Sequence, residues 1–365
     1  MKQKKVVIFI PSIEKGGVEK NLFIISDFLF KKLKDLTIIS ASKKAKKKFN
    51  KKIKFISPKS NIWDSFGRNI KYFVSVFLLI KKILNNRNII VLSFQANIYA
   101  IVICKIFFIK IITRSNSFPD DWSNSFLKKF IFKSILSLAN KNIVNSIEVK
   151  KKFISKYRIN PKCIYNPLNK KQIIKMSKAK VEKIYFKKNT LKIIHVGRFS
   201  KEKDHYTLLK SLLILKKKIN FEAVLLGSGK LKKNIQDFIK INKLKANVKI
   251  IDYKQNPYPY IKQADFLILT SLHEGLPNIL LEALILNKFV ISSNCETGPK
   301  EILLNGKGGG LFKVKDYNDL SKKIIFYLNK KSIRDEKVKI AKSKLYKFDY
   351  LKNLNEYYEL LKKYI

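Results

Sequence analysis

Two successive series of alternating strands and helices constrain the fold of this 365-residue chain most strongly. From residue 5 to about 165, short β-branched runs alternate with longer stretches that carry Leu, Ile or Phe at helical spacing. The same alternation resumes at Leu191, after a break at Asn166-Pro167. Such alternation is typical of a parallel sheet covered on both faces by helices, and a chain of this length exceeds one ordinary core. The sequence therefore predicts an α/β protein with two doubly wound domains.

The expected elements follow from the spacing of apolar residues. In the first half we expect strands at residues 5–10, 36–40, 53–56, 88–92, 109–113 and 142–145, and helices near 18–33, 66–84, 96–107, 123–139 and 147–156. In the second half we expect strands at 191–196, 222–226, 248–251, 265–269 and 289–292, and helices near 204–217, 230–242, 277–287, 316–329, 331–342 and 350–364.

The chain is strongly basic, with 78 Lys and Arg against 26 Asp and Glu and a formal net charge of +52. Such a charge favours nucleic acid or an anionic membrane surface, where each surface Lys contributes on the order of 1 kcal/mol. Arg is scarce, however, while Lys, Asn and Ile are abundant throughout. A·T-rich codon usage is therefore an alternative explanation, and the charge alone does not decide between them.

The cysteines and the apolar segments indicate a cytoplasmic protein. Cys104, Cys163 and Cys295 show neither paired nor metal-ligand spacing, which fits a reducing compartment. The first apolar run is too short for a signal sequence. Two further apolar segments, 72–84 and 98–112, contain lysines well before the ~20 residues needed to span a bilayer. We interpret them as domain helices and a strand, with interfacial contact as the alternative.

The segment from 273 to 304 carries two carboxylates around the start of an apolar helix. Pro277 is a favoured first helical residue, so a helix is expected from near Leu276 to about Asn287. The first-turn N–H groups of this helix would attract an anion such as a diphosphate. These groups belong to Leu276, Asn278 and Ile279.

Glu282 follows further along this helix, among leucines and an isoleucine. A carboxylate in such surroundings is costly unless strong donors meet it, and two ribose hydroxyls would serve. For an isolated pair, the simpler explanation is that Glu282 faces solvent and Glu274 merely favours a helix N-terminus. The surrounding residues reverse that preference and indicate a sugar-nucleotide site.

Those surrounding residues resemble one enzyme family. EGLPNILLEAL, the strand KFVISSN and then CETGPKEIL are similar to the donor-site signature of family 4 glycosyltransferases, which are retaining enzymes of GT-B fold. The similarity is greatest to bacterial members that extend lipid-linked oligosaccharides for surface polysaccharide or glycoprotein glycans. Further matching segments occur in sequence order: GGVEKN, SFQANIYA, RSN, YNP, HVGRFSKEKD and NPYPYIKQADFLILTS.

The resemblance implies a domain organisation as well as a fold. Two Rossmann-like doubly wound domains would face each other across a cleft. Residues 1–166 would form the acceptor-binding domain, with a terminal helix at 346–365 crossing back onto it, and residues 167–345 would bind the nucleotide sugar. The segments 165–171 and 342–349 would then be the two hinge strands.

The resemblance also implies roles for the charged residues. Arg198 and Lys203 match an R-x4-K pair that contacts the donor diphosphate, where fixed positive charge stabilises the departing group. Arg198 is the stronger candidate because its planar guanidinium suits phosphate. Glu274 would hold sugar hydroxyls near the reacting carbon and Glu282 the ribose, so the catalytic set is Glu274, Arg198 and Lys203. Donor contacts extend over Gly275, Leu276, Pro277, Asn278 and Ile279.

Several glycines follow predicted strands. Gly16 and Gly17 would let backbone approach phosphates or acceptor, although a tight turn is the ordinary alternative. Gly197 would allow close approach beside the diphosphate. Gly227 and Gly229 lack the third glycine of a dinucleotide fingerprint and are interpreted as a turn beside the nucleotide.

The chain departs from the family pattern at two places. Its histidines are confined to the second half, at His195, His205 and His273, whereas the family often has one in the first domain. Arg114, Ser115 and Asn116 occupy the corresponding region and are assigned to acceptor or sugar contact. Asp252 stands where the family usually has glycine, which leaves the base contact at Tyr253 open. His273 could be catalytic, or structural at a strand end.

No D-x-D triplet occurs, and Asp120-Asp121 has no evident partner ligands, so we expect no metal and no other cofactor. The leading prediction is a metal-independent hexosyltransferase that moves a hexose or N-acetylhexosamine, with retention, from a UDP-sugar to a polyprenyl-diphosphate-linked glycan. It would lie on the anionic inner face of the cytoplasmic membrane, without nucleic acid as a partner. The alternatives are a basic nucleic-acid-binding protein, or another GT-B activity such as a sugar-nucleotide epimerase or a phosphorylase.

Overall fold

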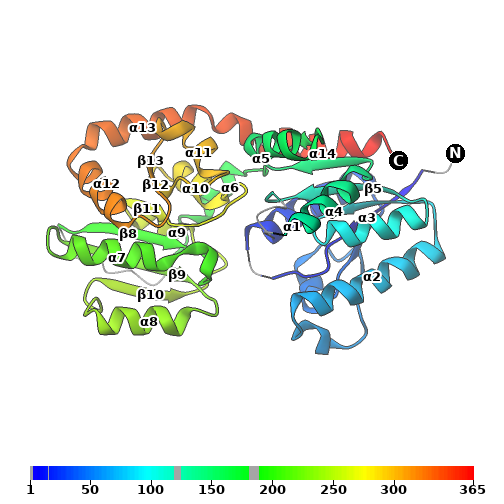
Figure 1. Cartoon of the computed structure of the whole chain (residues 1–365), viewed down its shortest axis with the longest axis horizontal. Helices are drawn as coiled ribbons and strands as arrows, with labels where there is room; N and C mark the ends of the chain where they lie inside the picture. Colours follow the sequence, from blue (N-terminus) through cyan, green and yellow to red (C-terminus); the bar gives the residue numbers. More distant parts are fainter. Residues whose placement is uncertain (1–2, 15, 119–124, 181–188) are drawn as a thin grey trace. The chain divides into compact units, whose positions relative to one another are not determined.

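A computed structural model describes residues 3–14, 16–118, 125–180 and 189–365. Asp120 and Asp121, and the start of the helix expected at 123–139, lie outside the described residues. The chain divides into two compact units, of which unit 1 comprises Met1–Pro167 with Tyr350–Ile365, and unit 2 comprises Leu168–Asp349 (Figure 1). The first division falls one residue from the expected boundary at 166/167.

Unit 1 contains a parallel sheet with strand order β3-β2-β1-β4-β5-β6-β7 among its described residues. The strands are β1 (Lys5–Phe9), β2 (Leu36–Ile39), β3 (Lys54–Ile56), β4 (Ile89–Ser93), β5 (Lys110–Ser115), β6 (Lys141–Val144) and β7 (Lys162–Cys163). The helices are α1 (Gly17–Leu33), α2 (Arg68–Asn85), α3 (Asn97–Ile106), α4 (Phe126–Ser137), α5 (Ile147–Lys152) and α14 (Tyr350–Lys362).

Alternate side chains of β1 supply both faces of this sheet, as the pleat requires. Val6 and Ile8 belong to a core that α1 and the returning α14 cover. Val7 and Phe9 belong to a second core, covered by α2, α3 and α5. The strands are therefore buried on both sides, which explains their near-continuous apolar runs.

Unit 2 contains a second parallel sheet, with order β10-β9-β8-β11-β12-β13. The strands are β8 (Leu191–Val196), β9 (Phe221–Gly227), β10 (Val248–Asp252), β11 (Phe266–Leu269), β12 (Phe289–Ser293) and β13 (Gly310–Phe312). The helices are α6 (Lys170–Met176), α7 (His205–Lys216), α8 (Lys232–Ile241), α9 (Tyr258–Gln263), α10 (Asn278–Ile285), α11 (Pro299–Ile302), α12 (Tyr317–Asn329) and α13 (Lys331–Ser343). Apolar residues of α7, α8 and α12 fill the core on one face of this sheet.

The structure confirms the two doubly wound sheets and corrects several boundaries. The short elements β7, β13, α6, α9 and α11 were not expected, because a few residues give no readable period. Pro277 is the N-cap of α10 and not its first helical residue, since its ψ of 102° is extended. The helix ends before Asn287, whose φ of 60° is left-handed.

Candidate active site

The carboxyl ends of the parallel strands place the loops after β8, β11 and β12 at one edge of the unit 2 sheet, where ligands bind in open α/β sheets. β8 and β11 are neighbours at the centre of the strand order, and β12 follows β11. The loop after β8 carries Arg198 and Lys203, and the loop after β11 carries Glu274. The sheet therefore brings together segments that are about 70 residues apart in sequence.

Hydrogen bonds lock the first two loops to each other. Thr270 Oγ1 donates to the carbonyl of Lys203 over 2.8 Å, and the Leu272 N–H donates to the carbonyl of Glu202 over 2.8 Å. These bonds fix the Lys203 backbone beside the strand that leads to Glu274. Lys203 Nζ then forms an ion pair with Glu274 Oε1.

Glu274 is held at several of its atoms. Its side chain is 12% exposed, and Oε1 also accepts a 2.7 Å hydrogen bond from Ser271 Oγ. Thr297 Oγ1 donates to its backbone carbonyl. The carboxylate therefore has a fixed position and orientation, as a group that contacts a substrate hydroxyl requires.

The third loop, after β12, closes over the segment that follows Glu274. Ser293 Oγ donates to the Ser271 carbonyl over 2.6 Å. Gly298 has a φ of 88°, and a Cβ there would lie 2.4 Å from the Gly275 carbonyl oxygen and 2.8 Å from Pro277 Cδ. A glycine is therefore required where the GPKE turn packs on the loop before α10.

Arg198 lies on the same sheet edge and is exposed. Nearby Glu202 has a pKa below its usual value, chiefly because the Ser200 side chain donates a hydrogen bond to it, with smaller contributions from the charges of Arg198 and Lys203. The loop after β8 thus carries an exposed guanidinium as well as Lys203 of the half-buried Lys203–Glu274 pair. Arg198 and the segment around Pro277 lie at the same edge of unit 2, as the diphosphate hypothesis needs.

The glycines of the β8 and β9 loops have a packing explanation. A Cβ on Gly227 would lie 1.9 Å from the Gly197 carbonyl oxygen, and one on Gly229 would lie 2.3 Å from the Phe199 carbonyl oxygen. A Cβ on Gly197 would meet His195 Cε1 at 3.2 Å and the Lys203 side chain at 3.7 Å. Gly227 and Gly229 therefore let two backbones touch, and this accounts for both without a nucleotide.

Glu282 is buried in α10, only 5% exposed, so the solvent-facing alternative is wrong. Tyr258 Oη donates a 3.2 Å hydrogen bond to Glu282 Oε1. The sequence predicted that a buried Glu282 needs strong donors but did not single out Tyr258, which lies 24 residues earlier on α9. Part of the cost of burying this carboxylate is therefore offset inside the protein.

The amino end of α10 follows Glu274 directly. Leu276 and Pro277 are buried, whereas Asn278 and Ile279 are half-buried in its first turn. The N-terminal end of this helix carries the positive pole of its dipole. Positive potential from α10 therefore adds to that of Lys203 and Arg198 at the same edge.

Two buried histidines lie beneath this edge. His195 and His205 are 0% and 2% exposed, their ring centroids are 4.4 Å apart, and none of their ring nitrogens has a hydrogen-bond partner within the described part of the chain. Burial and, to a smaller extent, the charge of Lys203 lower the pKa of His205 to about 4. The pKa of His195 is also well below its usual value, first because of burial and then because of His205. Both rings are therefore neutral at physiological pH.

Arg114 and Ser115, which the sequence assigned to acceptor or sugar contact, are buried inside unit 1. Arg114 is fully buried, with Nε 2.7 Å from Tyr357 Oη and Nη2 2.7 Å from Asn166 Oδ1, and it also donates to Asn116 Oδ1. Its guanidinium joins β5 to α14 inside unit 1 and is not exposed to solvent. Ser115 is 2% exposed as well.

Three further predicted donor contacts can be located. Gly16 is the N-cap of α1 and has extended backbone at a φ of −178°, and Gly17 begins that helix. Both conformations are ordinary, so a plain turn explains Gly16. Tyr253, 38% exposed, follows β10 at the outer edge of the unit 2 sheet, two strands from β8.

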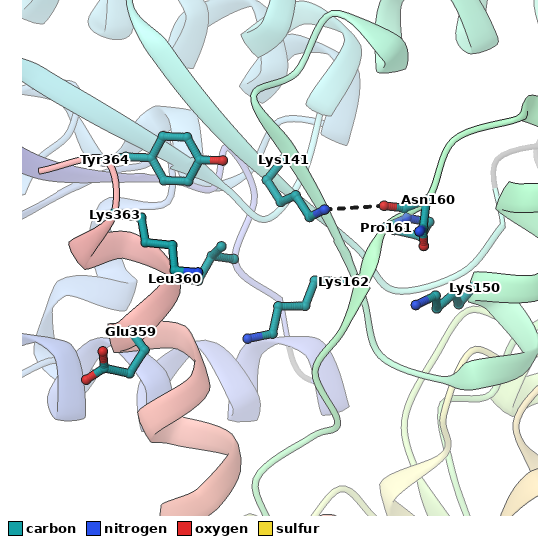
Figure 2. A pocket seen from close by; sticks show the side chains of 9 residues that line it. All are labelled: Lys141, Lys150, Asn160, Pro161, Lys162, Glu359, Leu360, Lys363 and Tyr364. Atoms are coloured by element: carbon teal, nitrogen blue, oxygen red, sulfur yellow. Dashed lines mark hydrogen bonds between the residues drawn. The ribbon is translucent and has the colours of Figure 1, made fainter.

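One cavity of unit 1 lies away from these residues. Figure 2 shows this cavity of about 430 Å³, where Lys141, Lys150, Lys162 and Lys363 gather and Lys141 Nζ donates to the Asn160 carbonyl over 3.4 Å. Lys141 and Lys162 begin β6 and β7, so this cavity lies at the amino ends of the strands. Ligands of parallel sheets bind at the opposite ends, and we do not assign the donor to it.

In the ranges that the structure describes, no three His, Cys, Asp or Glu side chains are grouped as a metal site. None of the helices within those ranges is both long enough and apolar enough to cross a bilayer.

Comparisons with known proteins agree with this geometry. Residues 176–344 match the family model "Glycosyl transferases group 1". An uncharacterized glycosyltransferase of Methanocaldococcus jannaschii is 38% identical over 117 residues, which are 32% of this chain and 29% of the relative. An N-acetylgalactosamine-N,N'-diacetylbacillosaminyl-diphospho-undecaprenol 4-alpha-N-acetylgalactosaminyltransferase of Campylobacter jejuni is 27% identical over 232 residues, 63% of this chain and 62% of the relative. The aligned region thus spans less than two thirds of either relative.

A solved structure extends the comparison to nearly the whole chain. Anabaena HepE in complex with UDP is 15% identical and covers 98% of this chain and 100% of its own, with a TM-score of 0.76. This likeness shows the fold of both units. The chain therefore has the GT-B fold of two Rossmann-like domains, and its residues 176–344 match the glycosyl transferases group 1 model.

Proposed function

We propose that this chain is a retaining, metal-independent hexosyltransferase. It moves a hexose or N-acetylhexosamine from a UDP-sugar to a polyprenyl-diphosphate-linked glycan in surface polysaccharide or glycoprotein synthesis. One observation carries the donor part of the proposal: the hydrogen-bonded Lys203–Glu274 pair at the carboxyl edge of the unit 2 sheet, beside Arg198 and the amino end of α10.

Lys203 and Glu274 would exchange partners when a nucleotide sugar binds. Without donor, each charge neutralises the other in a half-buried site. A diphosphate would compete for Lys203 Nζ, and the freed Glu274 oxygen would accept from sugar hydroxyls while Ser271 keeps the carboxylate in place. Arg198 and the α10 dipole would stabilise the charge that grows on the leaving phosphate, so no metal ion is needed for that task.

Glu282 and Tyr258 would hold the ribose. The carboxylate already accepts from Tyr258 Oη, and a carboxylate can accept further hydrogen bonds from two ribose hydroxyls. We include Tyr258 in the donor site for this reason, although the sequence alone did not select it.

The acceptor and the location come from the relatives. The Campylobacter protein is named for transfer to a diphospho-undecaprenol-linked glycan, and HepE was solved with UDP. We infer a similar lipid-linked acceptor and peripheral attachment to the inner face of the cytoplasmic membrane. Lysines are dispersed through the sequence without a nucleic-acid reader motif, so nucleic acid is not part of the proposal.

The reaction is tested with the purified full-length chain. It is incubated with a panel of UDP- and GDP-sugars and a polyprenyl-diphosphate-linked disaccharide, with and without EDTA. We expect one UDP-sugar to be consumed, a product heavier by one sugar in mass spectra, an α-anomer by NMR, and no effect of EDTA. A folded sample that neither binds nor turns over any nucleotide sugar would overturn the proposal.

Two substitutions separate the proposed roles. Arg198→Ala should lower kcat by about 10²-fold with little change in donor affinity, because its contact matters as charge develops. Glu282→Ala should instead weaken UDP-sugar binding in calorimetry. Equal and negligible effects of both would mean that the residues are misassigned.

A further inference from the structure

Helices α2, α3 and α4 of unit 1 carry an apolar surface that faces away from the core. The outward stripe of α2 is Ile70, Phe73, Phe77, Lys81 and Leu84, all exposed and spaced by three or four residues. Its inward stripe contains Lys71 and Ser75 as well as Leu79 and Ile83. A helix of a soluble protein usually places its polar side outward, so the exposed apolar stripe of α2 departs from the usual pattern.

The neighbouring helices continue this surface. α3 contacts both α2 and α4, so the three helices lie in a row on one face of the sheet (Figure 1). The outward side of α3 is Tyr99, Val102 and Ile106. On α4, Phe126 is 85% exposed and Phe130 is 60% exposed, and only Leu136 of that helix is buried.

We call the exposed apolar residues of α2, α3 and α4 the α2–α4 face. Phe73 and Phe77 form an edge-to-face pair with ring centroids 5.0 Å apart, and the two side chains are 67% and 58% exposed. Monomeric proteins rarely leave so large an apolar area in water, and such areas mark binding surfaces.

The charges on these helices identify what covers them. The three helices contain eight Lys and Arg and no Asp or Glu: Arg68, Lys71, Lys81, Lys82, Lys105, Lys128, Lys129 and Lys133. Lys71 is buried and Arg68 forms an ion pair with Glu14, so the other six supply the charge of this surface. Lysine stems lie along apolar surface while the ammonium groups reach a charged layer. Exposed phenylalanines interleaved with lysines are the composition of helices that lie in the boundary between lipid headgroups and acyl chains.

A second copy of this chain fits the α2–α4 face poorly. In a two-fold dimer the same patch meets itself, so lysines would oppose lysines with no carboxylate on these helices to compensate. An anionic bilayer supplies both the apolar layer and the negative charge.

We propose that the α2–α4 face docks unit 1 onto an anionic lipid bilayer, with the phenylalanines inserted below the headgroups and the lysines beside lipid phosphates. This inference rests on the peripheral attachment in the proposed function and supplies its contact surface, but it does not depend on the transfer reaction.

Vesicle flotation of the full chain tests the proposal. Vesicles of phosphatidylcholine alone are compared with vesicles containing 30% phosphatidylglycerol, at low and high salt. We expect binding to the anionic vesicles that falls with salt, and much weaker binding to neutral ones. Phe73→Ser/Phe77→Ser/Phe130→Ser should reduce partitioning by at least about tenfold, and each of Lys81→Glu and Lys105→Glu by roughly fivefold.

A matched variant provides the control. Ile241, Phe326 and Leu351 are also exposed apolar residues, but they lie on α8, α12 and α14. Ile241→Ser/Phe326→Ser/Leu351→Ser should bind vesicles like the wild type. UDP binding and the unfolding midpoint should be unchanged in both triple variants, since every altered side chain is exposed.

Three results would overturn the proposal. One is absence of wild-type binding to the anionic vesicles, and another is equal loss of binding in the two triple variants. The third is that the wild type sediments as a dimer and the phenylalanine variant as a monomer, while the variant still binds vesicles. The α2–α4 face would then be an interface between copies. Donor turnover measured in the same samples separates these outcomes from a failure of the proposed reaction.

Discussion

At the scale of single residues, Glu274 differs from an ordinary surface carboxylate because each of its contacts has a separate task. Ser271 orients it, Lys203 neutralises it, and Thr297 holds its backbone. Lys203 therefore cannot fully neutralise Glu274 and bind an incoming diphosphate at the same time.

Glu274→Gln tests this competition. The amide keeps an acceptor for Ser271 but removes the charge that holds Lys203. We expect UDP affinity to stay the same or rise, while kcat falls by about 10²-fold because the sugar hydroxyls lose a charged acceptor. Calorimetry with UDP and steady-state kinetics give the two values. Ser271→Ala is the control, because it removes the orienting hydrogen bond but keeps the charge of Glu274. A parallel loss of UDP affinity and turnover would show instead that Glu274 mainly supports the local fold.

The buried histidines predict a pH dependence of stability. Folding lowers the pKa of His205 from 6.5 to about 4. Between these two pH values the ring is protonated in the unfolded chain but neutral in the native one. The stabilisation is complete above about pH 6.5 and is lost as the pH falls from 6.5 towards 4, by roughly 3 kcal/mol for this residue.

Urea unfolding between pH 4.5 and 7.5 measures this dependence. His205→Phe should flatten the decline because it removes one of the two titrating rings, whereas His273→Ala, at an exposed position, should leave the slope unchanged. An unaltered slope in His205→Phe would assign the acid sensitivity to other groups.

At the scale of elements, the loops after β8 and β9 are joined backbone to backbone through glycine. Gly227→Ala would place a methyl group 1.9 Å from the Gly197 carbonyl oxygen, and backbone cannot move aside as a side chain does. We expect a loss of about 1–3 kcal/mol in the free energy of unfolding. Lys203 would be displaced as well, because its stem lies over Gly197.

Gly67→Ala is the matched control for this change. A Cβ there meets nothing within 4 Å, and only the weaker N-cap preference of alanine is expected, about 0.5–1 kcal/mol. Chemical denaturation of both variants, with UDP binding as a second readout, decides the point. Equal losses would show that the clash at Gly227 is relieved by local rearrangement.

The sequence predicted the long elements well because each carries several turns or a continuous apolar run. It missed α9 and β13, whose few residues take their structure from neighbours rather than from a period of their own. In the candidate site, the sequence predicted the helix that the structure contains as α10, but no sequence pattern specified that Tyr258 would meet Glu282. Contacts between separate elements depend on how the sheet brings them together.

Arg114 is a second residue whose contacts the sequence did not predict. Its place after a strand, in a segment resembling a binding motif, predicted contact with substrate. The structure instead surrounds its guanidinium with Tyr357, Asn166 and Asn116. A basic side chain at a strand end points into a site or into the protein according to what packs there, and Tyr357 comes from a helix 243 residues away.

At the scale of the whole molecule, unit 1 is closed by a helix from the other end of the chain. Besides the Arg114–Tyr357 bond, Lys162 pairs with Glu356 over 3.2 Å, and the Lys4 N–H donates to the Ile365 carbonyl over 3.4 Å. α14 also packs on α1.

Tyr357→Phe measures how much the buried contact contributes. The ring still fills its place, but one donor of a fully buried guanidinium loses its acceptor, and we expect a loss of about 1–3 kcal/mol. Burial of the Tyr357 hydroxyl already raises its pKa, while Arg114 opposes that shift, as expected for a charge contact. Thermal unfolding is the measurement, with exposed Tyr346→Phe as control. Equal midpoints for the two variants would show that apolar packing alone holds α14.

This closure also has a consequence for synthesis on the ribosome. The strands of unit 1 are translated before unit 2. Arg114 can bond to Tyr357 only after 243 more residues have been translated, which takes roughly 10–50 s at ordinary elongation rates. Unit 2 is contiguous from Leu168 to Asp349 and can fold completely during that interval. Unit 1 is therefore begun before unit 2 but finished after it, and until then the side of α1 that α14 covers stays unprotected.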